Sequence, residues 1–281
     1  MLFRQVSGGG HHDTYYIYDT KGNLCFVLQP MYQEVADLGK YAFQYKYDER
    51  GNCIWKKLPG AEPVTYEYDS NNRLAFSQDG NQRGQSTPKW AYYKYDHLDR
   101  LTEQGECTGK SDASSYQLQI RNHYDNYNFV GTTGFTDSRF TQDTSGYGKG
   151  SLTGSVACGT GVCSTVYTAY YYDARGREVK RVESNAMSGG YDVTTTAYTF
   201  TDKPQTVTHA HASSYKSLTE VTTYSYDHAD RLGKVQHKLD GGATVTLAEY
   251  AYDNLGRLQS KKLGGTEQYL NNELSTKKIF V

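Results

Sequence analysis

A short phrase of two tyrosines and an aspartate returns along this chain and limits its fold more than any other feature. Seven copies stand out, and in chain order they read YIYDTKGN, YKYDERGN, YEYDSNNR, YKYDHLDR, YYYDARGR, YSYDHADR and YAYDNLGR. The steps between their aspartates are 29, 21, 27, 77, 54 and 26 residues. A period of this size is typical of tandem repeat architectures. The two long steps leave room for weaker copies.

The phrase itself predicts a β-hairpin. Two tyrosines at i and i+2 lie on one face of a strand, and the aspartate then begins a turn by accepting hydrogen bonds from the backbone two residues on. The third residue after the aspartate is always Gly, Asn or Asp, types that tolerate positive φ. This is the pattern of a type I turn followed by a left-handed residue and a bulge. Asn or Arg comes next in every copy, usually followed by Leu.

The predicted structural positions are the two tyrosines, the aspartate and the left-handed residue of each copy. They are Tyr16, Tyr18, Asp19 and Gly22; Tyr45, Tyr47, Asp48 and Gly51; Tyr66, Tyr68, Asp69 and Asn72; Tyr93, Tyr95, Asp96 and Asp99; Tyr170, Tyr172, Asp173 and Gly176; Tyr224, Tyr226, Asp227 and Asp230; Tyr250, Tyr252, Asp253 and Gly256.

Two worn copies fill the long steps and bring the total to about nine units. HYDNYNF places Asp125 29 residues after Asp96, and Asn128 then occupies the left-handed position. If YTFT is aligned with YxYD, Pro204 falls three residues after Thr201, where a proline cannot take positive φ. That turn is expected to differ from the others.

The predicted fold class is therefore all-β. A single hairpin is marginal in water, so the hairpins are expected to stack into one continuous twisted or spiral antiparallel sheet. Residues 1–281 form a single repeat region in this interpretation, with an irregular insert over 131–161 and a non-repeat tail over 266–281. A short helix is expected over Gln33 to Leu38, ended by Gly39.

Composition agrees with strands and turns. Tyr and Gly each number 28 while Met numbers 3, and the aromatic content of 14% argues against disorder despite a mean hydropathy of -0.77. A net charge of -1 provides no field for nucleic acid or an anionic membrane, so neither partner is expected. No stretch is apolar enough for a membrane helix, and the opening MLFRQVSGGGHHD contains no apolar run of signal-peptide length.

Candidate phosphate and thiol chemistry has simpler interpretations. GECTGKS ends like a phosphate-binding loop, but Gly105 stands one residue too close and no helix start follows, so a polar loop is favoured. GYGKG at 146–150 lacks the third glycine of a dinucleotide fingerprint. The five cysteines are odd in number and do not form a disulfide framework. Cys158 and Cys163 flank a Gly-rich turn, and both a disulfide and two free thiols remain open.

Metal and hydrolytic sites are also not expected. His209 and His211 lie on one face of a strand as half of a metal site, but no third ligand is evident, and His11, His12, His97 and His228 read as exposed positions. The repeated aspartates suggest carboxylate pairs for sugar hydrolysis, yet each is already assigned to its own turn. The sequence contains no GxSxG or HExxH motif. We therefore predict no enzyme activity, cofactor or metal.

The copies YKYDERGN, YEYDSNNR, YSYDHADR and YAYDNLGR resemble the YD-repeat or RHS (rearrangement hotspot) family of bacterial secreted and surface proteins, from about Tyr15 to Leu263. The resemblance implies a spiral β-sheet wound into a hollow shell around a toxin or effector, with the tyrosines as its spine, and a secreted or cell-surface location. Members that release a toxin carry an Asp-Pro cleavage motif, which is missing here. The expected function is a non-catalytic segment, or arc, of such a shell.

Two further expectations accompany this interpretation. YD repeats are also proposed to hold carbohydrate, and a tyrosine-rich face can stack on sugar rings, so a carbohydrate-binding or adhesion module is the alternative function. The strand around Thr14 to Tyr18 is uncharged and aromatic, and it is expected to form an exposed sheet edge. Partners are then flanking repeats, a toxin or effector cargo, or a second copy joined through edge strands.

Overall fold

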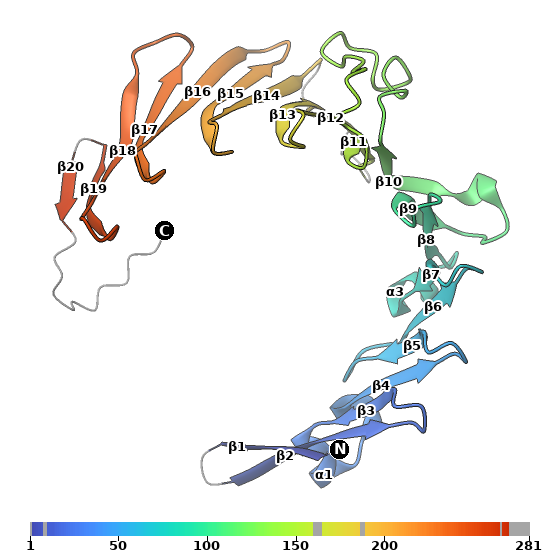
Figure 1. Ribbon diagram of the computed structural model, residues 1–281. Coiled ribbons are helices and arrows are strands. Elements are labelled where there is room, and N and C mark those ends of the chain that lie inside the picture. The colour runs from blue at the N-terminus through green and yellow to red at the C-terminus, as the bar shows by residue number, and fades with distance from the viewer. Residues whose placement is uncertain (1, 8–9, 160–164, 186–188, 265, 270–281) are drawn as a thin grey trace. The chain divides into compact units, whose positions relative to one another are not determined.

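The structure is a computed structural model that describes residues 2–7, 10–159, 165–185, 189–264 and 266–269. Contacts divide the chain into two compact units, 1–122 and 123–281, with the boundary inside one strand. In both units every strand is antiparallel to its neighbours in sequence (Figure 1). The predicted all-β hairpin array is confirmed.

Unit 1 is a meander in which each strand pairs with the next. Its strands are β1 (Leu2–Ser7), β2 (Gly10–Tyr18), β3 (Leu24–Leu28), β4 (Ala42–Tyr47), β5 (Cys53–Lys57), β6 (Val64–Tyr68), β7 (Leu74–Gln78), β8 (Trp90–Tyr95), β9 (Leu101–Cys107) and β10 (Gln117–Tyr124).

The prediction of an exposed edge at Thr14 to Tyr18 is wrong at its start. Thr14 pairs with Phe3 and Tyr15 with Leu2, because β1 covers that part of β2.

Unit 2 continues the same pattern with longer strands. Its strands are β11 (Leu152–Ala157), β12 (Val166–Tyr172), β13 (Glu178–Ser184), β14 (Tyr191–Tyr198), β15 (Pro204–Ala212), β16 (Ser217–Tyr226), β17 (Leu232–Leu239), β18 (Val245–Tyr252), β19 (Leu258–Leu263) and β20 (Thr266–Tyr269).

The turns follow the predicted geometry. All seven predicted left-handed residues have positive φ, from 62° at Asp99 to 87° at Gly51. Each motif aspartate accepts a hydrogen bond from the amide two residues on, as Asp69 does from Asn71 at 2.9 Å. The predicted bulge is present in every motif hairpin, because two residues oppose the aspartate: the Asn72 amide donates to the Asp69 carbonyl, and the Asp69 amide donates to the Arg73 carbonyl. The ladder register shifts once more beside the second tyrosine, for example between Glu67 and Tyr68. The sequence pattern thus specifies turn, left-handed residue and bulge together.

The predicted helix is misplaced. Helix α1 (Pro30–Val35) begins at the proline and ends where Ala36 takes a left-handed conformation, with φ 53°. A second short helix, α2 (Leu38–Tyr41), starts after Asp37, whose side chain accepts the amides of Gly39 and Lys40. Gly39 is therefore inside a helix and does not end one, because Asp37 supplies a stronger N-cap signal than the glycine supplies a stop. The other helical segments are α3 (Gly80–Arg83) and the 3-10 helix η1 (Ala113–Ser115).

The irregular insert carries the main aromatic core of unit 2. Residues 126–150 are largely turns and irregular backbone. The expected bounds of 131–161 are wrong at the end, because β11 occupies Leu152–Ala157. Tyr127 stacks on Tyr171 with ring centroids 5.0 Å apart, and Phe135 is 1% exposed and meets Tyr167 edge to face. Tyr167 and Tyr171 lie on the face of β12 opposite to the motif tyrosines. The insert therefore buries one face of the sheet and leaves the motif face uncovered by it.

A smaller cluster lies on the equivalent face of unit 1. Tyr92 is 2% exposed and packs on Tyr116, with ring centroids 4.4 Å apart. A Cβ at Gly105 would lie 2.8 Å from the Tyr92 ring and 2.1 Å from the carbonyl oxygen of Gln117. Gly105 is thus a packing glycine within β9, and the first three residues of GECTGKS belong to that strand. Its last four residues, 108–111, begin the connection between β9 and β10, which agrees with the polar-loop interpretation there.

Candidate functional site

The second tyrosine of a repeat ties its hairpin to the preceding one. Its hydroxyl donates to the carbonyl of the residue that begins the returning strand of the hairpin before it. The pairs and O···O distances are Tyr47 to Leu24 (2.9 Å), Tyr68 to Cys53 (3.0 Å), Tyr172 to Leu152 (2.6 Å), Tyr198 to Glu178 (2.8 Å), Tyr226 to Pro204 (2.7 Å) and Tyr252 to Leu232 (3.0 Å).

The tyrosine hydroxyl is needed because neighbouring hairpins separate near their turns. Between β5 and β6 the ladder contains only the pairs Trp55 with Thr65 and Lys56 with Val64. The carbonyl of Cys53 lies beyond these pairs, and it accepts the Tyr68 hydroxyl in place of a strand partner. A half-buried carbonyl that loses its partner costs free energy, so the phenol stabilises the join.

The residue that follows the left-handed position, the fourth after the aspartate, closes its own turn. We call it the clamp residue. Its side chain donates to the second carboxylate oxygen of the motif aspartate, as the Nδ2 of Asn52 does to Asp48 at 2.9 Å and the Nε of Arg73 does to Asp69 at 2.8 Å. The same bond occurs in the other copies, from Asn23, Arg100, Arg177, Arg231 and Arg257.

Several clamp residues also reach the turn of the following hairpin. The Nη1 atom of Arg73 donates to the carbonyl of Asp96 at 3.0 Å and to the carboxylate of Asp99 at 2.8 Å. Arg177 reaches the carboxylate of Asp202 at 2.6 Å. The hairpins are therefore linked in both directions, backwards through a phenol and forwards through a cation.

The forward cation also covers the ring that makes the backward bond. The guanidinium of Arg231 lies 4.5 Å from the ring centroid of Tyr252. Arg73 takes the same position over Tyr95, at 5.1 Å, although Tyr95 is not among the backward donors above. Arg177 over Tyr198 and Lys203 over Tyr226 repeat the arrangement at 4.6 and 5.2 Å. Such cation–π contacts contribute about 0.5–1 kcal/mol at exposed sites. At these junctions, where the clamp is basic, the clamp contacts both the ring and the following turn.

The surroundings of these groups keep the motif aspartates ionised and the tyrosine hydroxyls protonated, as the links require. The side-chain hydrogen bond from Arg231, followed by the backbone amide of the same residue, lowers the pKa of Asp227 to about 2. Asn52 and Arg177 lower the pKa of Asp48 and Asp173 in the same way. Burial raises the pKa of the Tyr68 and Tyr172 hydroxyls, so they stay protonated and able to donate.

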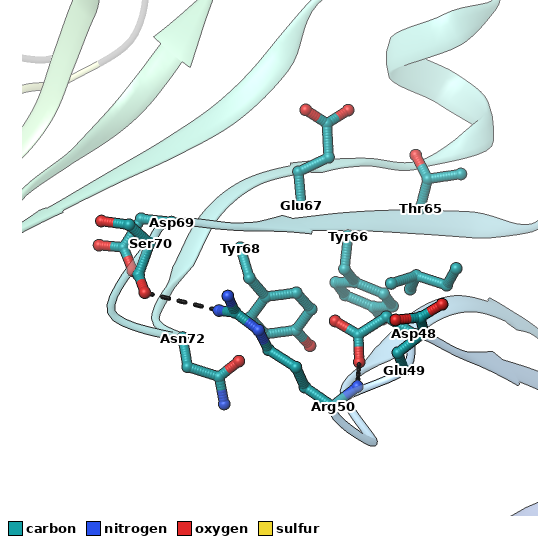
Figure 2. Close-up of a pocket in the computed structure, with 11 residues that line it drawn as sticks. Asp48, Glu49, Arg50, Thr65, Tyr66, Glu67, Tyr68, Asp69, Ser70 and Asn72 are labelled. Atoms are coloured by element: carbon teal, nitrogen blue, oxygen red, sulfur yellow. Dashed lines mark hydrogen bonds between the residues drawn. The ribbon is translucent and has the colours of Figure 1, made fainter.

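The separation between two hairpins of unit 1 forms an open groove of about 850 Å³ between the turns of β4–β5 and β6–β7. Figure 2 shows Tyr66 and Tyr68 on one side of β6, with Thr65 and Glu67 on the other. The Arg50 side chain crosses the groove and donates to the carbonyl of Ser70 at 3.5 Å (Figure 2). Aromatic faces and hydrogen-bonding groups thus line one hollow.

The two strand histidines do find an acidic neighbour. Asp192 on β14 lies opposite His211, with its Oδ1 2.7 Å from His211 Nδ1 and 3.5 Å from His209 Nε2. Asn185 donates to the other oxygen of this carboxylate at 3.0 Å. Across the part of the chain that the structure describes, no three His, Cys, Asp or Glu side chains are grouped as metal ligands. His11 and His12 are described only as backbone of β2.

The sequence left the state of the cysteines open. Cys25, Cys53 and Cys107 carry free thiols, and the proposed pairing of Cys158 involves Cys163, which lies outside the described residues. None of the described helices is long and apolar enough to cross a membrane.

The prediction that Asn128 is left-handed is wrong. Asp125 donates its amide to the carbonyl of Ser151 at 3.1 Å, the bond that closes the other turns, and Gly150 has φ 85°. This copy keeps its turn closure, but residues 126–150 replace the usual three residues. The left-handed role falls to Gly150, because the insert lies before that position.

The prediction of a different turn at Pro204 is also wrong. Thr199 takes the aspartate position, since its amide bonds the carbonyl of Lys203 and its hydroxyl accepts the Lys203 amide at 3.1 Å. Asp202 is the left-handed residue, with φ 65°. The true alignment is shifted by two residues, so Pro204 begins the returning strand, where proline is tolerated.

Comparison with known proteins finds no matching protein-family model and no matching curated protein. Among solved structures, the crystal structure of TcdB2-TccC3-TEV is similar over 93% of this chain, with 14% identity and a TM-score of 0.40. The Photorhabdus luminescens Tc holotoxin pore gives 16% identity and 0.42 over the same share. The chain spans 14% of the length of each. A porin-like protein from Bacteroides uniformis gives 10% and 0.20. Likeness at this level carries no conclusion about function.

Proposed function

We propose that this chain is a non-catalytic segment of a YD-repeat shell wall that encloses or presents a toxin or effector. The observation that carries the proposal is the two-way link between hairpins, in which the backward phenol and the forward clamp recur from junction to junction. Such links make a sheet in which each hairpin is stabilised by its contacts with the neighbouring hairpins.

The chemistry of the motif supports a structural role. Each motif aspartate is occupied by two amides and its clamp residue, as Asp69 is by Asn71 and Arg73, and its carboxylate is not available as a free acid or base. By the family resemblance, the cargo would be a toxin or effector and the location secreted or cell-surface. Residues 1–281 would belong to a single repeat region, with the Tyr and Asp positions as its structural residues.

A graft tests the wall function directly. Residues 64–107, which hold the hairpins β6–β7 and β8–β9, replace two hairpins in a YD-repeat shell that protects a cargo from protease. We expect the cargo to stay protected. The matched control carries Asp69→Ala and Asp96→Ala in the same graft and should expose the cargo. A folded graft that leaves the cargo digested would contradict the proposal.

The groove beside Tyr66 and Tyr68 favours carbohydrate binding as a second candidate function. Sugar rings stack on exposed aromatic faces while their hydroxyls bond to charged and amide side chains, and Arg50, Glu49 and Asn72 line the same hollow. A glycan array on the chain is the test. Several reproducible hits that disappear in Tyr66→Ala would favour a binding module, and an array without hits would exclude the glycans tested.

A further inference from the structure

The junctions between hairpins differ in the residue that faces the clamp. A clamp residue lies beside the left-handed residue of the following turn, so the two positions can be compared one junction at a time. The neighbouring pairs are Asn23 and Gly51, Asn52 and Asn72, Arg73 and Asp99, Arg177 and Asp202, Lys203 and Asp230, and Arg231 and Gly256.

Charge is matched across these pairs. All three left-handed aspartates in this set face a basic clamp: Asp99 is 2.8 Å from Arg73, Asp202 is 2.6 Å from Arg177, and Asp230 is 3.0 Å from Lys203. Both asparagine clamps face an uncharged residue. At the Asn52 junction the two side-chain amides bond each other, with one contact of 2.5 Å and one of 3.1 Å.

The aspartates need an explanation, because glycine takes positive φ at lower cost. An aspartate there gains nothing within its own turn, where the motif aspartate already accepts the amides. The residue that it contacts belongs to the preceding hairpin. Asp202 is the clearest case, since it accepts from both Arg175 and Arg177, at 2.8 and 2.6 Å.

We propose that the clamp and the following left-handed residue form a matching code that decides which hairpin can follow which. A turn with a left-handed Asp fits behind a basic clamp and is disfavoured behind Asn, which leaves its carboxylate without a cation. A turn with Gly fits behind either kind, as it does behind Asn23 and Arg231. Specificity then arises from the mismatched pair as much as from the matched one.

The test introduces a charged pair like that of Arg73 and Asp99 at the neutral junction of Asn52 and Asn72. Asn52→Arg, Asn72→Asp and the double variant form a double-mutant cycle read by urea unfolding. Both new residues suit their positions, since Arg closes turns at Arg73 and Asp tolerates positive φ at Asp99. We expect Asn72→Asp alone to shift the equilibrium towards unfolding and the double variant to recover it, with a coupling of about two- to fivefold in the unfolding constant.

Two controls make the result specific. The coupling should shrink in 1 M salt, where the charges are screened. A cycle between Asn52→Arg and Asp99→Asn, which lie at different junctions, should show no coupling. A coupling factor of one for the transplanted pair, or a factor unchanged by salt, would overturn the code. The cycle measures the coupling between the side chains of two neighbouring hairpins, so its outcome is independent of whether the array encloses a cargo.

Discussion

Removal of one backward phenol tests the linkage between hairpins most directly. In Tyr68→Phe the ring and its packing stay, and the hydroxyl that donates to the Cys53 carbonyl at 3.0 Å is lost. A neutral hydrogen bond contributes about 0.5–1.5 kcal/mol net, and the half-buried carbonyl left behind finds water only in part. We expect the free energy of unfolding to fall by about 1 kcal/mol.

The same motif offers the matched control. Tyr66 lies two residues away on the same face (Figure 2). Among the described residues, no hydrogen bond is formed by its hydroxyl, in contrast to that of Tyr68. Tyr66→Phe should change the free energy of unfolding by less than about 0.5 kcal/mol, as surface substitutions do. Urea unfolding followed by circular dichroism measures both, with the slope required to stay constant. Equal losses in the two variants would refute the role assigned to the second tyrosine.

Four further predictions follow from other features. Gly256→Val, at φ 80°, should cost about 1–2 kcal/mol in a thermal melt while Gly256→Asn costs less, because Asn tolerates positive φ better than a β-branched residue does. Phe135→Ala should cost about 3–5 kcal/mol in urea, since this ring is the centre of the insert core and is 1% exposed. The lowered pKa of Asp227 stabilises the fold above the unfolded-state value near 3.9, and this contribution is lost as pH falls towards 2; melts at pH 5, 3 and 2 should therefore decline less steeply for Asp227→Asn. Light scattering at tens of micromolar should show association through edge strands, reduced by Phe3→Lys with Val6→Lys on β1, and a stable monomer of the unmodified chain would contradict it.

The turn chemistry was predictable because it is local. The spacing of Tyr, Asp and Gly or Asn within one copy was enough to assign the left-handed residue and the bulge, as at Asn72 and Arg73. The position of the clamp residue was also visible, since Asn or Arg stands there in all seven clear copies. Its forward reach was not, because the acceptor belongs to another hairpin and depends on how two turns are placed.

The errors have physical causes of the same kind. The copy around Thr199 was misaligned because YTFT resembles YxYD, and only the hydrogen bond from the Thr199 amide to the Lys203 carbonyl identifies the turn. The irregular insert was predicted over 131–161, and its packing was not foreseen, because that packing depends on a few rings such as Tyr127 and Phe135 that meet strands distant in sequence. The Asp192 partner of His211 was invisible because strand register sets it.

The two directions of the linkage have a consequence for how the chain is made. A ribosome releases the repeats in order, at steps of about 20–30 residues. The phenol of a newly released hairpin finds its acceptor on the hairpin already completed, so it can dock at once. The clamp of that hairpin must wait for the next turn. Each hairpin can thus fold against the one that precedes it, through contacts between residues close in sequence. This favours rapid, stepwise folding during synthesis over a single collapse afterwards.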